Sequence, residues 1–279
     1  MLEIQQLSFS YRKHWVFKDF SFALPDGQIC LVTGINGVGK STLLRLMAGV
    51  LTANSGTIRY VETMGKNPKR KIGFISDSLS FYESLTVSQA CDYHRSAFGL
   101  PRIFDDLIRH TKVRGDQKIK ELSAGQRTIL HLSLVLSQDP ELLLIDEVIH
   151  SIDAYLRRLF LDALIERMSQ KTMTVVMVNL NFHDVEHLID RVVLLKSGQV
   201  VVDETIDDLK AKVKKAIALS PPPTWPILFQ RRYRDYSEFY IYPYSPGLPS
   251  EGQAKIMDLN LTEIVTAFIG GEYAEERIS

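Results

Sequence analysis

The feature that most constrains this chain is a glycine-rich segment, Gly34-Ile35-Asn36-Gly37-Val38-Gly39-Lys40-Ser41, between a strand-like run and a helical pattern. The apolar run 28–33 precedes it, and leucines at helical spacing follow it. Glycines that frame a lysine and a hydroxyl are typical of a phosphate-binding loop, whose amides surround phosphate oxygens at a helix N-terminus. The alternative is a glycine-rich turn without a ligand, which these flanks disfavour. The segment therefore predicts an α/β protein that binds a nucleotide.

The residues of this loop and of the first helical turn are the candidates for phosphate binding. Lys40 is expected to reach the β- and γ-phosphates, which makes it a catalytic candidate as well. Ser41 is expected to ligate Mg²⁺. The whole candidate set is Gly34, Asn36, Gly37, Val38, Gly39, Lys40, Ser41 and Thr42.

A second motif is the apolar strand Leu142–Ile145, which ends in two acids. In a chain with a phosphate loop, an acid at the end of such a strand is typical of a Mg²⁺ partner. We expect Asp146 to hold the metal through water and Glu147 to polarise an attacking water as a catalytic residue. The other interpretation is a strand that simply ends in solvated acids.

A third motif, Leu122-Ser123-Ala124-Gly125-Gln126, lies 20 residues before Asp146. With these motifs in this order, residues 1–205 resemble the ATP-binding cassette (ABC) family, whose signature is usually Leu-Ser-Gly-Gly-Gln. The resemblance implies that ATP and Mg²⁺ are the cofactors. It also implies that Ser123, Gly125 and Gln126 face the γ-phosphate held by a second cassette. A plain helix cap is the alternative, because Ser123 and Gln126 also match a capping box.

The same resemblance assigns two further positions. Tyr11 matches the aromatic residue that stacks on adenine, although an ordinary strand tyrosine is the alternative. Asp153 matches the loop that contacts the second cassette, because Ser151-Ile152-Asp153 follows Glu147 at the usual distance.

Two positions depart from the family pattern. Asp77 stands where the family has a glutamine, and an acid there is expected to bind Mg²⁺ or its water. Leu180 stands where the family has its switch histidine, and leucine cannot donate a hydrogen bond to the γ-phosphate. His183 is the candidate substitute. The spacing of His183 and His187 also fits a metal pair, but a polar helix face is the simpler interpretation. These departures predict slow hydrolysis rather than loss of nucleotide binding.

Charge and composition exclude several functions. The chain has 33 basic and 33 acidic residues among 279, so it lacks the basic surplus of a nucleic-acid binder, and we expect no nucleic-acid partner. Its 2 cysteines cannot form a disulfide framework. The longest uncharged stretch, 216–230, is shorter than a membrane span and contains four prolines. The N-terminus lacks a signal-peptide pattern.

Strand-like and helical patterns alternate, which favours a mainly parallel sheet covered by helices. The expected fold is a P-loop NTPase of the ABC type, with a mainly parallel core sheet, an antiparallel N-terminal sheet, a helical subdomain at about 80–137 and a small C-terminal α+β module. The expected domains are 1–205 and 206–279. In the second we expect a hairpin over 227–244 and a helix over 261–269, and we interpret Asn54-Ser55-Gly56 as a turn.

Together these features predict an ATPase subunit that energises a separately encoded integral membrane permease from the cytoplasmic face of the membrane. Its second partner would be another copy of itself or a paralogous cassette. An exporter of peptides, lipids or antimicrobials is the expected type, and the segment 76–84 is expected to couple to the permease. Two alternatives remain: a weakly hydrolysing regulatory or pairing subunit, and a soluble cassette ATPase that is not linked to transport.

Overall fold

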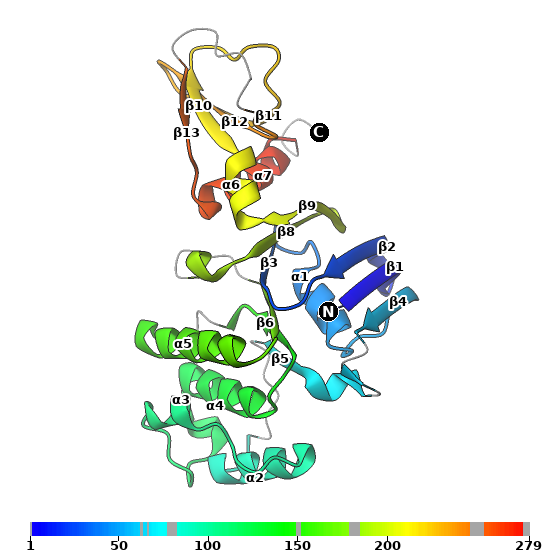
Figure 1. Cartoon of the computed structure of the whole chain (residues 1–279), viewed down its shortest axis with the longest axis vertical. Helices are drawn as coiled ribbons and strands as arrows, with labels where there is room; N and C mark the ends of the chain where they lie inside the picture. The colour runs from blue at the N-terminus through cyan, green and yellow to red at the C-terminus, as the bar shows by residue number, and fades with distance from the viewer. Residues whose placement is uncertain are drawn as a thin grey trace. The chain divides into compact units, whose positions relative to one another are not determined.

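The computed structural model describes residues 2–61, 64–65, 67–76, 83–148, 152–178, 185–245 and 254–275. Within these ranges the strands form three sheets (Figure 1). The chain order of strands and helices up to the end of the helical region is β1 Leu2–Tyr11, β2 His14–Leu24, β3 Ile29–Thr33, α1 Lys40–Met47, β4 Ser55–Tyr60, η2 Pro68–Lys71, β5 Ile72–Ser76, α2 Val87–Phe98, α3 Asp106–Arg109, η3 Ile119–Glu121 and α4 Ala124–Ser137.

The remaining elements complete the central sheet and build the C-terminal module. They are β6 Leu142–Asp146, α5 Ala154–Gln170, β7 Thr174–Val178, η5 Glu186–Leu188, β8 Arg191–Lys196, β9 Gln199–Thr205, α6 Ile206–Lys212, β10 Lys214–Ala218, β11 Ile227–Arg232, β12 Ser237–Ile241, β13 Lys255–Met257 and α7 Leu261–Glu275.

The central sheet has the strand order β5-β6-β7-β3-β8-β9. β5, β6 and β7 pair in parallel, whereas β8 and β9 form an antiparallel hairpin. Every residue of β3, β6 and β7 is buried. These strands read as continuous apolar runs because a parallel strand is covered on both faces. The predicted α/β fold with a mainly parallel core is confirmed.

The N-terminal sheet is antiparallel, as predicted, with the order β2-β1-β4. Alternate residues of β1 and β2 are buried where the sheet has one covered face. The interpretation of Asn54-Ser55-Gly56 as a turn is wrong for Ser55 and Gly56, which begin β4. Gly56 has a φ of 85° and a Cβ there would lie 2.4 Å from the Gln6 carbonyl oxygen, so glycine is needed for the close approach of β4 to β1.

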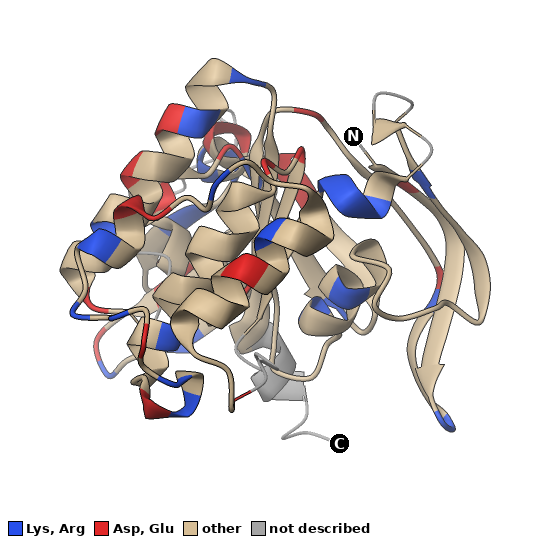
Figure 2. Ribbon diagram, turned by 90° about the horizontal axis from the view of Figure 1, so that it is seen from below, with Lys and Arg blue, Asp and Glu red and all other residues tan. Residues whose placement is uncertain are grey.

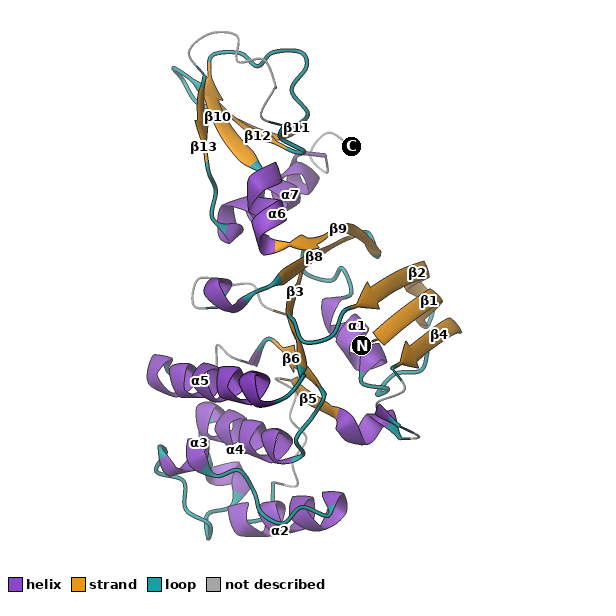
Figure 3. Ribbon diagram, in the orientation of Figure 1, coloured by secondary structure: helices purple, strands orange, loops and turns teal. Residues whose placement is uncertain are grey.

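The capping box expected from the sequence at Ser123 is present, and a second one begins α2. Thr86 caps α2 with Gln89, and Ser123 caps α4 with Gln126. The helices α2 to α5 gather in one region (Figure 3), and α3 contacts both α4 and α5. An apolar cluster packs α2 against α4; its buried members are Val87, Ala90, Ile119, Leu122, Leu130 and Leu134.

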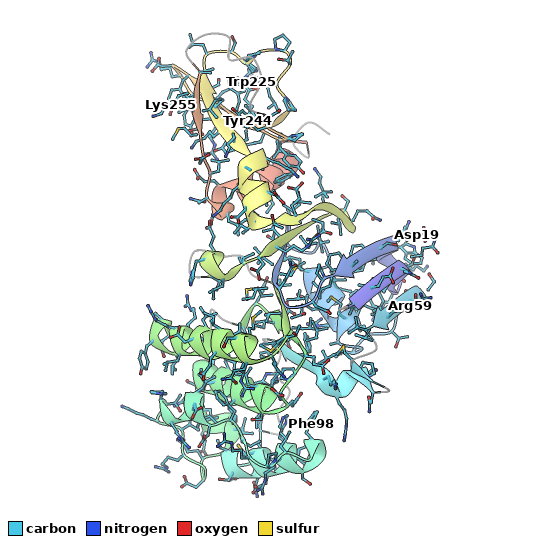
Figure 4. All side chains as sticks on the ribbon, in the orientation of Figure 1. Asp19, Arg59, Phe98, Trp225, Tyr244 and Lys255 are labelled. Atoms are coloured by element: carbon cyan, nitrogen blue, oxygen red, sulfur yellow. The ribbon has the colours of Figure 1, made fainter. Side chains whose placement is uncertain are left out.

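The C-terminal module is an antiparallel sheet with the order β11-β12-β10-β13, together with α6 and α7. The predicted hairpin is confirmed as β11 and β12, and the predicted helix is longer, since α7 runs to Glu275. Trp225 and Phe239 are buried in its core, with Tyr244 packed against them; Figure 4 shows Trp225 and Tyr244 on the ribbon of this module.

The chain divides into two compact units. The first comprises Met1–Cys30 and Gly39–Asn179, and the second Leu31–Val38 and Leu180–Ser279. The second unit therefore combines the front half of the glycine-rich segment with the C-terminal module. Among the described helices, none is both long and apolar enough to cross a bilayer.

Candidate nucleotide-binding site

The glycine-rich segment forms a loop between β3 and α1, as expected. Its three glycines have φ values that other residues rarely adopt: 144° at Gly34, 83° at Gly37 and 112° at Gly39. The amide of Val38 donates to the carbonyl of Ile35 at 3.3 Å, which closes a turn inside the loop. Backbone of this kind presents successive amides to one concave face, the arrangement that binds phosphate.

Two of the glycines are also required by close packing. A Cβ at Gly34 would lie 2.4 Å from the carbonyl oxygen of Leu195 in β8. A Cβ at Gly39 would lie 2.7 Å from Val16 and 2.8 Å from Phe17, both in β2. The β2 strand therefore supports the last turn of the loop. Sequence spacing identified these glycines, but it did not identify Val16, Phe17 or Leu195 as their supports.

Lys40 and Ser41 open α1 at the end of this loop. The Lys40 side chain is buried, and burial lowers its pKa, while Glu147 and Asp146 raise it by charge. The Ser41 hydroxyl lies 2.8 Å from Oδ1 of Asp146, to which it donates a hydrogen bond. Asp146 ends β6 and is 3% exposed. The structure thus brings together the serine and the acid that were both expected to bind Mg²⁺.

A serine hydroxyl and a carboxylate are oxygen ligands of the kind that Mg²⁺ takes. Mg²⁺ keeps several waters and takes one or two protein oxygens together with substrate phosphates. Among the described residues there is no cluster of three or more His, Cys, Asp or Glu side chains that would form an all-protein metal cage. A Mg²⁺ ion bound here would neutralise charge on the phosphates of the nucleotide.

Glu147 is exposed and follows Asp146 directly. Its φ is 55°, a left-handed conformation that is rare for glutamate and costs free energy. Its backbone amide donates to the carbonyl of Val178 at 3.1 Å, which ties the end of β6 to the end of β7. Strained backbone of this kind is concentrated at functional sites. The conformation agrees with the catalytic role expected of Glu147.

The signature segment lies at the start of α4. Ser123 Oγ accepts from the Gln126 amide at 3.2 Å, and Gln126 Oε1 accepts from the Ser123 amide at 2.9 Å. Ala124 and Gly125 form the first turn of the helix. Both polar side chains are therefore engaged in the helix cap, and Gly125 leaves the first turn without a side chain. Such a helix start is able to receive an anion.

Two other predicted residues lie at the ends of elements. Tyr11 ends β1 with 43% of its surface exposed and its ring at a right angle to that of Phe9. An exposed ring at this place is available for stacking. Asp153 caps α5 by accepting from the Leu156 amide at 3.0 Å. The positions Asp77, Leu180, His183 and Ser151 lie outside the described residues, whereas His187 lies in η5.

Charges of both signs alternate over the described ribbon in Figure 2. Several of these charged side chains form ion pairs, such as Lys71 with Glu141 and Arg191 with Asp203. This distribution agrees with the balanced composition of the chain.

A family model described as "ABC transporter" matches residues 17–150. The chain is 30% identical over 224 residues to the ABC transporter ATP-binding protein YtrB of Bacillus subtilis, covering 77% of this chain and 75% of that protein. The chain belongs to the ABC transporter ATP-binding family. It is therefore an ATP-binding cassette ATPase.

Other relatives of this cassette include the linearmycin resistance ATP-binding protein LnrL of Bacillus subtilis, 27% identical over 76% of this chain and 72% of that protein. A solved ATP-binding subunit of an ABC transporter superposes with a TM-score of 0.68 at 24% identity, covering 75% of this chain and 92% of that one. A dimeric cassette bound to ADP and Pi superposes with a TM-score of 0.63 at 18% identity, covering 74% and 99%. These superpositions confirm the cassette fold.

Proposed function

We propose that this cassette dimerises around two Mg·ATP and energises a separate membrane permease from the cytoplasmic face of the membrane. The observation that carries the nucleotide site is the Ser41–Asp146 hydrogen bond next to the buried Lys40. The second cassette, a copy or a paralogue, would supply its own Ser123, Gly125 and Gln126 to the γ-phosphate. Asp153, Tyr11 and Asp77 would contact the partner cassette, the adenine and the metal, respectively.

The direction of transport that we propose is export of a peptide, lipid or antimicrobial. It is supported by the name of LnrL, a resistance protein, and by that of the probable multidrug transporter protein YbhF of Escherichia coli, which is 30% identical over 85% of this chain and 42% of that protein. Relatives named as importers are also similar, such as the spermidine/putrescine protein PotA of Haemophilus influenzae. The permease would therefore select the substrate, and the cassette would supply free energy from ATP.

The role of a permease is tested by isolating the tagged full chain from detergent-solubilised membranes of its host. We expect an integral membrane protein to copurify and to raise the ATP turnover of the cassette. Lys40→Ala is the matched control, since it should keep the partner but lose turnover. A chain that copurifies only with ribosomes, or with no membrane protein at all, would contradict the proposal and favour a cassette ATPase unrelated to transport.

Dimerisation is tested with Glu147→Gln. This change keeps the size of the side chain but removes the carboxylate that would polarise water. We expect the variant to stop hydrolysis and to accumulate an ATP-dependent dimer, measured by size-exclusion chromatography with light scattering. The control is the double variant Lys40→Ala/Glu147→Gln, which should stay monomeric with ATP. A Glu147→Gln chain that remains monomeric at saturating Mg·ATP, with or without its membrane partner, would contradict the sandwich dimer.

A further inference from the structure

The turn between β11 and β12 of the C-terminal module is rich in arginine and tyrosine. The turn and the last residues of β11 read Arg231-Arg232-Tyr233-Arg234-Asp235-Tyr236, and all six residues are exposed. The Tyr233 amide donates to the Tyr236 carbonyl at 2.9 Å, which closes the hairpin. None of these six residues belongs to the buried core of the module or to the candidate nucleotide site. Their exposure and composition therefore call for a different role.

The two tyrosines of the turn form a fixed apolar surface. Their rings are stacked, with centroids 4.7 Å apart and an angle of 21° between the planes. The Tyr233 hydroxyl donates to Glu238 Oε2 at 3.4 Å, which ties this ring to β12. Tyr233 and Tyr236 are nevertheless 42% and 41% exposed. Tyrosine combines an apolar ring with a polar hydroxyl, so exposed tyrosines of this kind suit the boundary between a membrane and water.

Two other exposed side chains lie at the same end of the sheet. Ala218 ends β10 opposite Ser237, the first residue of β12, and Leu219, which follows, is 84% exposed. Lys255 begins β13 opposite Ile217 of β10 and is also exposed; Figure 4 shows Lys255 on β13. This end of the sheet therefore adds an apolar side chain and a fourth cation to those of the hairpin turn.

The charge at this end of the sheet is positive, although the whole chain is neutral. Among the described residues, no ion pair engages Arg232 or Arg234. Glu238 is 12% exposed and lies 3.9 Å from Lys215 Nζ, so its charge is compensated within the sheet. Asp235 is the exposed acid of the turn. Three arginines and the lysine of β13 outnumber that acid.

These features fit a charged lipid surface better than a protein or a nucleic acid. A stable protein interface takes about 20–30 residues from each partner, far more than the eight residues of this patch. A single-stranded nucleic acid stacks its bases on free aromatic rings, whereas each tyrosine here has one face covered by the other. A cluster of four or more basic side chains next to apolar groups is instead typical of binding to anionic lipids.

We propose that this basic patch, formed by Leu219, residues 231–236 and Lys255, binds the surface of an anionic lipid bilayer directly. The arginines and Lys255 contact the phosphate and carboxylate groups of the lipids, while Tyr236 and Leu219 enter the headgroup region. This contact goes beyond the proposed coupling to a permease, because it needs no membrane protein. It gives the C-terminal module a role at the membrane that is separate from nucleotide binding.

Binding of the full chain to protein-free vesicles tests the proposal. Cosedimentation compares vesicles of phosphatidylcholine alone with vesicles that contain equal amounts of phosphatidylcholine and phosphatidylserine. We expect binding to the anionic vesicles, and we expect it to weaken at high salt, because salt screens exposed charges. Arg232→Gln/Arg234→Gln should lower the partition coefficient roughly thirtyfold, since each arginine contributes about fivefold at an anionic surface.

Three variants separate charge at this place from other effects. Lys118→Gln/Lys120→Gln is the matched control, because it removes the same charge from exposed positions around η3 and should bind the anionic vesicles normally. Arg232→Lys/Arg234→Lys keeps the charge but loses the planar guanidinium group, and it should retain most of the binding. Tyr236→Ser should weaken binding to the anionic vesicles. Circular dichroism establishes that each variant is folded.

Several outcomes would overturn the proposal. They are equal binding to both kinds of vesicle, no binding to either, and an equal loss in Lys118→Gln/Lys120→Gln. Loss of binding in Arg232→Lys/Arg234→Lys would also overturn it, because a partner that needs the guanidinium group, such as an acidic protein segment, would then be favoured. Displacement of the vesicles by a single-stranded oligonucleotide would overturn it in favour of a nucleic acid. Failure of a permease to copurify would contradict the proposed function and leave these vesicle measurements unaffected.

Discussion

Lys40 is a buried cation at the start of α1, beside the carboxylates of Asp146 and Glu147. Burial of a charge is unfavourable unless opposite charge lies near it, and the two acids supply that opposite charge. A nucleotide would add strong negative charge at the same place. Lys40 is therefore placed to add a favourable charge interaction when a nucleotide binds.

Replacement of Lys40 by alanine should weaken Mg·ATP binding. A hydrogen bond to a charged group is worth about 1.5–3 kcal/mol, which corresponds to a loss of affinity of roughly ten- to a hundredfold. Isothermal calorimetry measures the affinity, and Lys120→Ala, in η3 near the signature segment, is a control that should bind normally. Unchanged affinity in Lys40→Ala would contradict the assignment of the phosphate loop.

The replacement of the switch histidine by Leu180 should make turnover slow. A well-placed donor to developing charge is worth on the order of 10²–10³ in rate. We therefore expect Leu180→His to raise single-turnover hydrolysis by on the order of 10²–10³. If His183 has taken over the role, His183→Ala will abolish the remaining activity instead. Fast turnover by the unmodified chain that responds to neither change would show that the switch lies elsewhere.

At the scale of elements, α4 combines an exposed N-terminus with a half-buried ionisable side chain. Its N-terminus carries the signature residues, and the half-buried His131 lies one helical turn beyond Arg127. Burial lowers the pKa of His131 to about 3, and nearby His94 lowers it further by charge. His94 itself has a pKa lowered by burial and lies 3.1 Å from the side-chain nitrogen of Gln138 at the end of α4. The packing of α2 on α4 thus requires neutral histidines.

Acid should therefore destabilise this packing. An unfolded histidine has a pKa near 6.5, so below that pH the unfolded state binds a proton that folded His131 does not accept until about pH 3. The contribution of neutral His131 to the free energy of unfolding is fully present above about pH 6.5. It decreases by about 1.4 kcal/mol per pH unit as the pH falls from there toward 3. Urea unfolding at pH 7 and pH 5 measures the effect. His131→Leu should reduce the loss by about 2 kcal/mol, and His14→Gln on the exposed hairpin should not. An equal loss in His131→Leu and the unmodified chain would contradict this account.

At the scale of the whole molecule, the candidate residues for phosphate and metal binding all precede the C-terminal module, yet Glu186 and Glu204 form ion pairs with α6 of that module. Binding of the nucleotide and its turnover should therefore respond differently to the loss of the module. The domain boundary proposed at residue 205 falls at the junction of β9 and α6, and α6 packs on β8 and β9. Removal of α6 would uncover those strands, whereas a cut after Val213 would keep it.

Truncation of the module should leave the affinity for ATP within about threefold of the value for the unmodified chain. The same truncation should lower the hydrolysis rate. Two truncations, after Thr205 and after Val213, separate the contribution of α6 from that of the sheet and α7. Circular dichroism establishes that each variant is folded before calorimetry and single-turnover assays are made. A folded truncation that binds no ATP would show that the module belongs to the nucleotide site.

Local sequence patterns were sufficient for the loop, the helix caps and the buried strands. The phosphate loop needs glycines at fixed spacing, and a capping box needs two side chains three residues apart, so both signals lie within a few neighbouring positions. For the same reason the hairpin of β11 and β12 was predictable. By contrast, β10 was missed, because its strand contains Lys214 and Lys215 and is stabilised by pairing with β12 and β13.

Contacts between distant parts of the chain required the tertiary structure. Ser41 and Asp146 are separated by 105 residues, and Glu186 and Leu261 by 75. The motifs by themselves predicted that Ser41 and Asp146 share a metal, because their chemistry requires it. Nothing in the sequence around Glu186 indicated its contact with α7, since a solvated glutamate in a short helix has the same local pattern. Sequence alone determined the family and the candidate residues for nucleotide binding, because these depend on residue type and short spacing. The tertiary structure decided which side chains support those groups, because close packing joins residues that the chain order keeps apart.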